Sequence, residues 1–67
     1  GRHAEAARCF RAAVRASPED ALAWQNLGTA SLMIGDPAGA AESLERLRRL
    51  APIRAAELAA RMRAAGL

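Results

Sequence analysis

The 67-residue sequence is poor in several residue types on which other classes of protein depend. Tyrosine and lysine are absent, and Phe10 and Trp24 are the only aromatic residues. Cys9 stands alone, which excludes an intramolecular disulfide framework and a cysteine-based metal site. No apolar run approaches the roughly 20 residues of a membrane span, and the N-terminus does not have the layout of a signal peptide. We therefore expect no membrane span, and a cytoplasmic location is favoured.

What the sequence does contain indicates a small all-α domain. Alanine and leucine dominate, in long runs with arginine and glutamate that favour helices, and strand signals are missing. A chain of this length forms one domain with a core near the smallest stable size. Ten arginines against seven acidic residues give a net charge of +3. Because every basic residue is arginine, this balance indicates the coding bias of a GC-rich bacterial source as much as an adaptation.

The first of four predicted helices spans about His3 to Ala16. Its apolar residues recur at three- and four-residue steps, as on one packing face: Ala6, Phe10, Ala13 and Val14. Three arginines fall on another face: Arg8, Arg11 and Arg15. His3 and Cys9 lie about 120° apart around this helix, too far for a shared site. We expect an exposed His3 and a partly buried Cys9.

The second helix has a clear predicted start and end. Ser17 is the expected N-cap, Pro18 suits the first helical position, and Asp20 sits where a capping box needs an acidic group. Gly35 can adopt the left-handed conformation that ends this helix after about Ile34. Two adjoining stripes predict packing on two sides: Ala23, Leu27, Ala30 and Ile34, and next to them Trp24, Gly28 and Ser31. Glycine inside a helix costs about 1 kcal/mol relative to alanine, so Gly28 indicates a close approach by a partner backbone.

The third and fourth helices are also bounded by capping residues, prolines and glycines. Asp36 and Pro37 start a helix that continues to about Leu50, and the fourth spans about Ile53 to Ala65 and ends at Gly66. Ala51 cannot accept an amide hydrogen bond through its side chain, so the fourth helix is less well capped. On the third helix we expect solvated ion pairs between residues four apart: Glu42 with Arg46 and Glu45 with Arg49.

The unit from Ala21 to Arg54 resembles the tetratricopeptide repeat, a helix-turn-helix unit of about 34 residues. The resemblance rests on residues at the recurring positions of the family: Trp24, Leu27, Gly28, Ala40, Leu44, Leu47 and Pro52. At an offset of 34, Gly1 coincides with Gly35 and Pro18 with Pro52. The resemblance implies four antiparallel helices in one domain, 1–67, excised from a longer repeat protein. Residues 1–20 are then the second helix of a truncated repeat, 21–54 a complete repeat, and 55–67 a C-terminal capping helix.

The resemblance also implies a function, that of a non-catalytic scaffold that binds a peptide or protein segment. In the family the first helix of each repeat lines a concave face, and the exposed stripe of that helix here is Leu22, Gln25, Asn26, Thr29 and Met33. Asn26 coincides with an asparagine that often holds a ligand backbone or carboxylate in the family. The lysines of the family's clamp for acidic chaperone tails have no counterparts, because their places are taken by Gln25, Thr29, Ala56 and Ala60. No cofactor or metal is expected.

Three alternative functions stay open beside this one. Self-association is the first, because Phe10 and Val14 are expected to leave apolar surface uncovered where a preceding helix is missing. The second is an interaction arm of a larger enzyme. The third is a nucleic-acid surface on Arg8, Arg11 and Arg15 or on Arg46, Arg48 and Arg49, which interleaved acids and the lack of stacking aromatics disfavour. Enzymatic activity is not expected, since no serine or cysteine has a local histidine partner.

Overall fold

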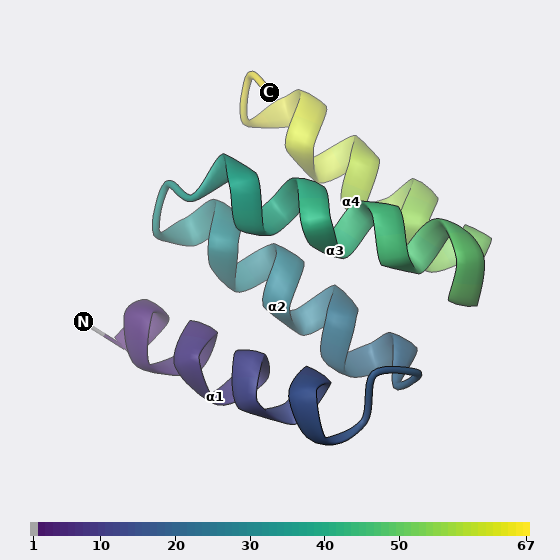
Figure 1. Cartoon of the computed structure of the whole chain (residues 1–67). Helices are drawn as coiled ribbons and strands as arrows, with labels where there is room; N and C mark the ends of the chain where they lie inside the picture. The colour runs from purple at the N-terminus through teal and green to yellow at the C-terminus, as the bar shows by residue number, and fades with distance from the viewer. Residues whose placement is uncertain (1) are drawn as a thin grey trace.

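A computed structural model describes residues 2–67 and consists of four α-helices. They are α1 (Arg2–Ala16), α2 (Ala21–Met33), α3 (Pro37–Leu50) and α4 (Pro52–Ala64). Successive helices run antiparallel and stack side by side, with α2 between α1 and α3 and with α4 packed against both α3 and α2 (Figure 1). The all-α prediction is confirmed, and residues 2–67 contain no strand. The expected equivalence of Gly1 and Gly35 lies outside the described residues.

Aspartate side chains cap the starts of α2 and α3, and the sequence prediction located one of these two caps correctly. Asp36 accepts a hydrogen bond from the Gly39 amide through Oδ1 at 3.1 Å and caps α3, as predicted. Gly35 has a φ of 71°, the left-handed conformation expected after α2. The predicted cap at Ser17 is wrong, because Asp20 caps α2 by accepting from the Ala23 amide at 3.2 Å.

The residues between α1 and α2 explain why the cap lies three positions later than predicted. The Asp20 amide donates to the Ser17 carbonyl at 3.0 Å, so these residues close a turn before the helix begins. Within that turn the carbonyl of Pro18 accepts the indole Nε1–H of Trp24 at 2.7 Å. Pro18 therefore serves as a turn residue that holds the Trp24 ring, instead of starting the helix.

The hydrophobic core surrounds α2, which is buried on two sides as predicted. Trp24 and Leu27 of α2 lie against Val14 of α1, Leu47 of α3 and Leu58 of α4 in one cluster. Four more residues of the two predicted stripes are also buried: Ala23, Gly28, Ala30 and Ser31. The exception is Ile34, which follows the end of the helix and is 42% exposed. The helical periodicity was extended one residue too far, since Ile34 is the C-cap and lies outside the last turn.

Gly28 marks a close approach between helices, but the approaching atoms belong to side chains. A Cβ at this position would lie 2.6 Å from Leu58 Cδ2 and 3.1 Å from Ser43 Cβ. The expected approach by a partner backbone is therefore corrected. Leu58 and Ser43 are both fully buried, so α4 and α3 meet over the space that Gly28 leaves.

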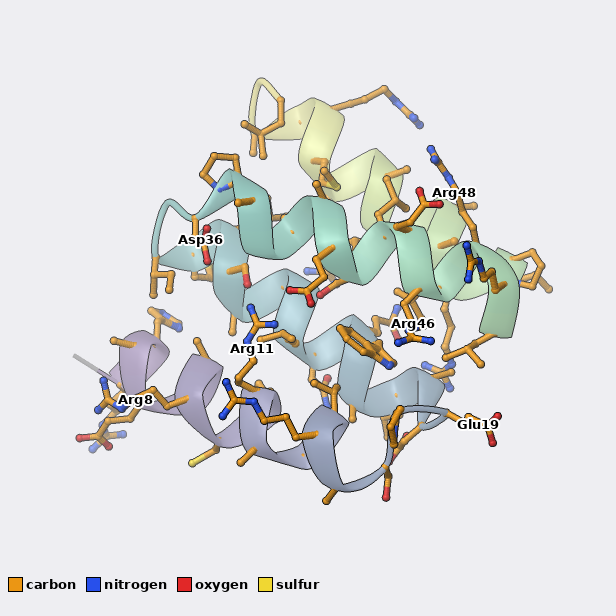
Figure 2. The ribbon with its side chains drawn as sticks, viewed as in Figure 1. Arg8, Arg11, Glu19, Asp36, Arg46 and Arg48 are labelled. Carbon is orange, nitrogen blue, oxygen red and sulfur yellow. The ribbon has the colours of Figure 1, made fainter. Side chains whose placement is uncertain are left out.

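The surface ion pairs differ from those predicted within α3. Glu42 pairs with Arg11 of α1 across an N···O distance of 2.5 Å, and Glu45 pairs with Arg48 at 3.7 Å. Arg46 lies over the Trp24 ring, 5.4 Å from its centroid, and so covers the indole instead of pairing with Glu42. Figure 2 shows Arg11 reaching from α1 toward α3, with Arg46 on α3. Glu42 and Arg46 have partners on neighbouring helices that compete with the pairing of these two charges, whereas Glu45 pairs three residues on along α3 instead of four.

The predicted packing face of α1 is covered in part: Ala13 is exposed, whereas Val14 is better covered than expected. Val14 is only 3% exposed, and Phe10 is half-buried against the core. Cys9 is exposed, so the prediction of a partly buried cysteine is wrong. His3 is exposed, as predicted. The large exposed apolar side chains lie outside α1: Leu22, Met33, Ile34, Ile53 and Leu67. Burial of Val14 removes part of the reason to expect self-association through α1.

Candidate functional site

The structure places four of the five predicted site residues around one hollow. Gln25, Asn26, Thr29 and Met33 of α2 line a cavity of about 350 Å³. Leu22 does not line it and stands 53% exposed at the start of α2. These four residues share one stripe of the helix because they are spaced by one, three or four positions. We call this cavity, with all its lining residues, the α2 groove.

Residues from two other helices complete the α2 groove, and the sequence prediction missed them. The wall from α1 consists of His3, Ala6 and Phe10, and α4 contributes Arg61. Arg61 had a sequence signal, because at an offset of 34 it stands where buried Leu27 stands in α2. A charged residue at a position that is apolar in the preceding repeat indicates that this side of α4 is open. The contribution of α1 had no comparable signal, since Phe10 also fits the core.

Gln25 is committed to contacts between helices. Its Oε1 accepts from Arg54 Nη1 at 2.5 Å, and its Nε2 donates to Glu57 Oε1 at 3.2 Å. Both partners belong to α4, so the Gln25 amide ties α2 to α4 at the edge of the groove. A ligand that used this amide would have to displace one of these partners, which makes Gln25 a weaker candidate than its neighbour Asn26.

Asn26, unlike Gln25, has no hydrogen-bond partner on another helix within the described residues. It is half-buried and lines the groove, and within residues 2–67 its side chain makes no hydrogen bond. An amide side chain offers two donors and one acceptor, enough to pair with both polar groups of a peptide unit. Asn26 is thus the side chain of the predicted stripe best placed to receive a ligand backbone.

A second hollow adjoins the α2 groove and extends it toward the end of α4. It has a volume of about 300 Å³ and shares Thr29, Met33 and Arg61 with the first. Its remaining lining is apolar: Leu32, Ala64 and Ala65. The exposed Met33 thioether thus stands between two hollows, where an unbranched and polarizable side chain can adapt to different apolar groups.

The lining of the α2 groove mixes polar and apolar side chains. Its polar groups are an imidazole, two amides, a hydroxyl and a guanidinium, spread over three helices among apolar side chains. Within residues 2–67 no three His, Cys, Asp or Glu side chains are grouped so as to hold a metal ion. None of the helices in the described chain is long and apolar enough to cross a membrane.

Comparisons with known proteins agree with the geometry. The tetratricopeptide repeat family matches residues 1–53. Cellulose synthase 2 operon protein C of Komagataeibacter xylinus is 45% identical over 62 residues, which are 92% of this chain but 5% of that protein. No solved structure matches the chain significantly. The family match spans most of the sequence, and the relative is similar over nearly all of it; the chain therefore belongs to the tetratricopeptide repeat family.

Proposed function

We propose that the chain is a non-catalytic interaction module that binds an extended protein segment in the α2 groove. Tetratricopeptide repeats generally mediate interactions between proteins, which supports the class of function. The observation that carries the choice of site is the half-buried, uncommitted amide of Asn26 inside a hollow of about 350 Å³. A polar group in such a place gains a hydrogen-bond partner when a ligand arrives and excludes water.

The other groove residues contact different groups of the bound segment. Phe10 and Met33 flank the hollow with apolar surface and receive an apolar side chain of the segment. Arg61 supplies guanidinium donors to a carbonyl or carboxylate, and Thr29 supplies a hydroxyl. A segment with an apolar residue beside a polar one therefore fits best. Gln25 holds α4 in place at the edge of the groove, through Arg54 and Glu57.

Peptides selected from a displayed random library on the purified chain would test this function. Their affinities for the wild type and for single variants are measured by fluorescence anisotropy. We expect Asn26→Ala to weaken binding about fivefold to tenfold, since removing one partner of a buried hydrogen bond costs about 1 kcal/mol or more. Arg61→Glu weakens binding as well, whereas Arg63→Glu, which changes the charge by the same amount on the same helix, does not.

Two outcomes would count against the α2 groove. One is an affinity that survives Asn26→Ala and Arg61→Glu. The other is an equal loss with the control variant Arg63→Glu, which would indicate a general effect of charge. Circular dichroism spectra of all variants exclude loss of helix as the cause. Gln25→Ala is informative too, because a loss of stability without a loss of affinity in the folded fraction fits a structural role.

The wider setting of the module is part of the proposal. The relative's name links that protein to a cellulose synthase operon, so products of such an operon are the first natural partners to test. We further propose the division into a second helix of one repeat (1–20), a complete repeat (21–54) and a capping helix (55–67), in a cytoplasmic protein. Limited proteolysis checks the division, and fractionation of cells checks the location.

A further inference from the structure

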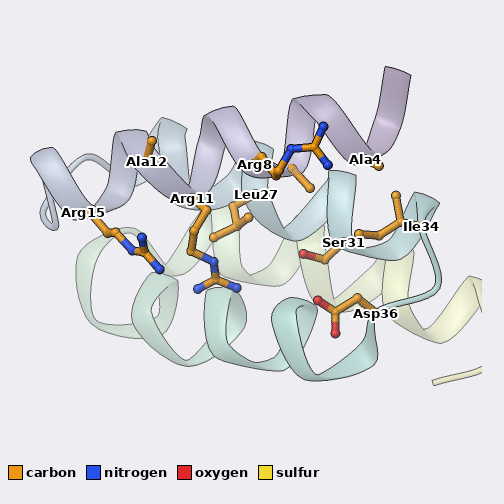
Figure 3. A pocket seen from close by; sticks show the side chains of 10 residues that line it. Ala4, Arg8, Arg11, Ala12, Arg15, Leu27, Ser31, Ile34 and Asp36 are labelled. Atoms are coloured by element: carbon orange, nitrogen blue, oxygen red, sulfur yellow. The ribbon is translucent and has the colours of Figure 1, made fainter. Parts of the chain in front are cut away.

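A separate hollow opens between α1 and α3 and shares no residue with the α2 groove. It has a volume of about 510 Å³, and Leu27 and Ser31 of α2 lie in its lining between the two helices. Arg8, Arg11 and Arg15 line it from α1. Figure 3 shows these three arginines along one helix, with Asp36 at the start of the facing helix α3. We call this hollow the arginine groove.

The three arginines differ in their partners. Arg11 Nη1 reaches across the groove to Glu42 Oε1 of α3 at 2.5 Å, and both side chains are partly exposed. Arg8 and Arg15 are exposed, and neither forms an ion pair with any acidic group of residues 2–67. The groove therefore has two uncommitted cations with a third, internally neutralised one between them. Apolar surface from Ala7 and Ile34 lies beside these charges.

We propose that the arginine groove binds an acidic, partly apolar segment of a protein partner. Carboxylates of the segment pair with Arg8 and Arg15, and one of them displaces Glu42 from Arg11. In the free chain Glu42 holds the place of that carboxylate and keeps the charge of the middle arginine neutralised. The site is independent of the α2 groove, so a chain bearing both could hold two segments at once.

The distance between Arg8 and Arg15 determines how far apart the acidic residues of the bound segment lie. Arg8 and Arg15 are seven residues apart on one helix, about 10 Å along its axis. About three residues of an extended chain cover the same distance. Two acidic residues separated by two others in a polyproline II segment, which has three residues per turn and rises about 9 Å over them, or by six in a helix, lie on one face and therefore meet both cations. Guanidinium groups favour such partners because they bind carboxylates through paired hydrogen bonds.

The lining favours a protein segment over a nucleic acid. Asp36 and Glu42 stand on the α3 side, where they repel a continuous chain of phosphates but tolerate scattered carboxylates. No aromatic side chain lines the groove to stack on a base. The exposed apolar surface of Ala12 and Ile34 suits alkyl side chains between the acids of a peptide.

The test uses the 67-residue chain and a labelled peptide of glutamate, alanine and leucine, with a matched peptide that has glutamine for glutamate. Affinity is measured by fluorescence anisotropy at low and physiological salt. We expect the glutamate peptide to bind and the combined change Arg8→Glu and Arg15→Glu to weaken it about tenfold, as loss of two exposed ion pairs predicts. Glu42→Gln frees Arg11 and strengthens binding about twofold to threefold.

Matched controls separate this site from general attraction. Arg48→Glu with Arg63→Glu changes the net charge equally away from the groove, and we expect an affinity within about twofold of the wild type. Asn26→Ala leaves the affinity unchanged, because it lies in the α2 groove. Circular dichroism confirms that each variant remains helical.

Each contrary result overturns the proposal in a recognisable way. Equal binding of the glutamine peptide, or no binding of the glutamate peptide at low salt, removes the acidic segment as the ligand. An equal loss with the control pair indicates diffuse charge, and weaker binding by Glu42→Gln indicates that Glu42 serves the fold alone. Stronger binding of a single-stranded oligonucleotide or of anionic lipid vesicles through Arg8 and Arg15 assigns the groove to a polyanion. A dimer in sedimentation that the same two changes dissociate assigns it to a second copy of the chain.

Discussion

Helices α2 and α4 contain residues that correspond at a sequence offset of 34, yet the surroundings of the two helices differ. Along α2 the buried residues are Ala23, Trp24, Leu27, Gly28, Ala30 and Ser31, whereas along α4 they are Ala55 and Leu58. α2 packs against all three other helices, and α4 packs against α3 and α2. The side chains changed accordingly: Leu27 corresponds to Arg61 and Gly28 to Met62. One pair of corresponding positions thus carries a core leucine in α2 and a groove arginine in α4.

The two helices also begin differently. Asp20 caps α2 through its side chain, and Ala51 precedes α4 with no side-chain hydrogen bond to the helix. More side chains are buried along α2, whereas α4 is held by buried Ala55 and Leu58, by Met62 packed against the core, and by the Gln25 hydrogen bonds. Four substitutions test this comparison, in order of expected effect.

Leu27→Ala should have the largest effect. Leu27 is 1% exposed at the centre of the core, so truncation leaves a cavity and lowers the free energy of unfolding by about 3 kcal/mol. The equivalent change Arg61→Ala removes an exposed side chain and alters stability by less than about 0.5 kcal/mol. Urea unfolding followed by the fluorescence of Trp24, the single tryptophan, measures both. Similar losses at the two positions would erase the distinction between α2 and α4.

Gly28→Ala should cause the second largest loss of stability. The new Cβ would meet Leu58 Cδ2 at 2.6 Å and Cδ1 at 3.0 Å in a fully buried contact. The clash outweighs the gain in helix propensity, and we expect a net loss of about 1 to 2 kcal/mol. In a Leu58→Ala background the clash with Leu58 is gone and only the contact with Ser43 Cβ at 3.1 Å remains, so the same change costs much less. A double-mutant cycle measured by urea unfolding gives the coupling, and an additive result would contradict the contact.

Asp20→Ala tests the helix starts. Loss of the hydrogen bond to the Ala23 amide should lower stability by about 1 kcal/mol. The matched gain is Ala51→Ser, which offers α4 a cap and should raise stability by about 0.5 kcal/mol. The comparison is Ser17→Ala, which should have almost no effect because Ser17 does not cap α2. Thermal unfolding by circular dichroism distinguishes these outcomes, and a larger loss for Ser17→Ala would restore the boundary predicted from sequence.

Arg46→Gln should have the smallest effect. The guanidinium lies 5.4 Å from the Trp24 ring centroid at the surface, so we expect a loss of about 0.5 kcal/mol. The emission of Trp24 should change as well, because a cation leaves the face of the indole. Arg49→Gln, a neighbouring change on the same helix, serves as the control. An unchanged spectrum in both variants would mean that Arg46 does not cover the ring in solution.

Local patterns determined most of the fold. The capping Asp36, the left-handed Gly35, and Pro37 and Pro52 placed α3, α4 and the end of α2 close to their observed positions. The stripe on α2 also led to four residues of the candidate site, since residues three and four apart share a helix face. The cap of α2 was misplaced because Ser17 and Asp20 carry similar capping signals, and the contact between Trp24 and Pro18 favours the later one.

Sequence alone thus determined the helices, their order and the family, because these depend on residues close together in the chain. Only the tertiary structure decided which polar side chains are committed to other helices and which face a groove. The Gln25 amide is satisfied by Arg54, 29 positions away, and Arg11 pairs with Glu42, 31 positions away. Pairs so distant leave no periodic trace in the sequence, since they arise when packed helices bring separate faces together.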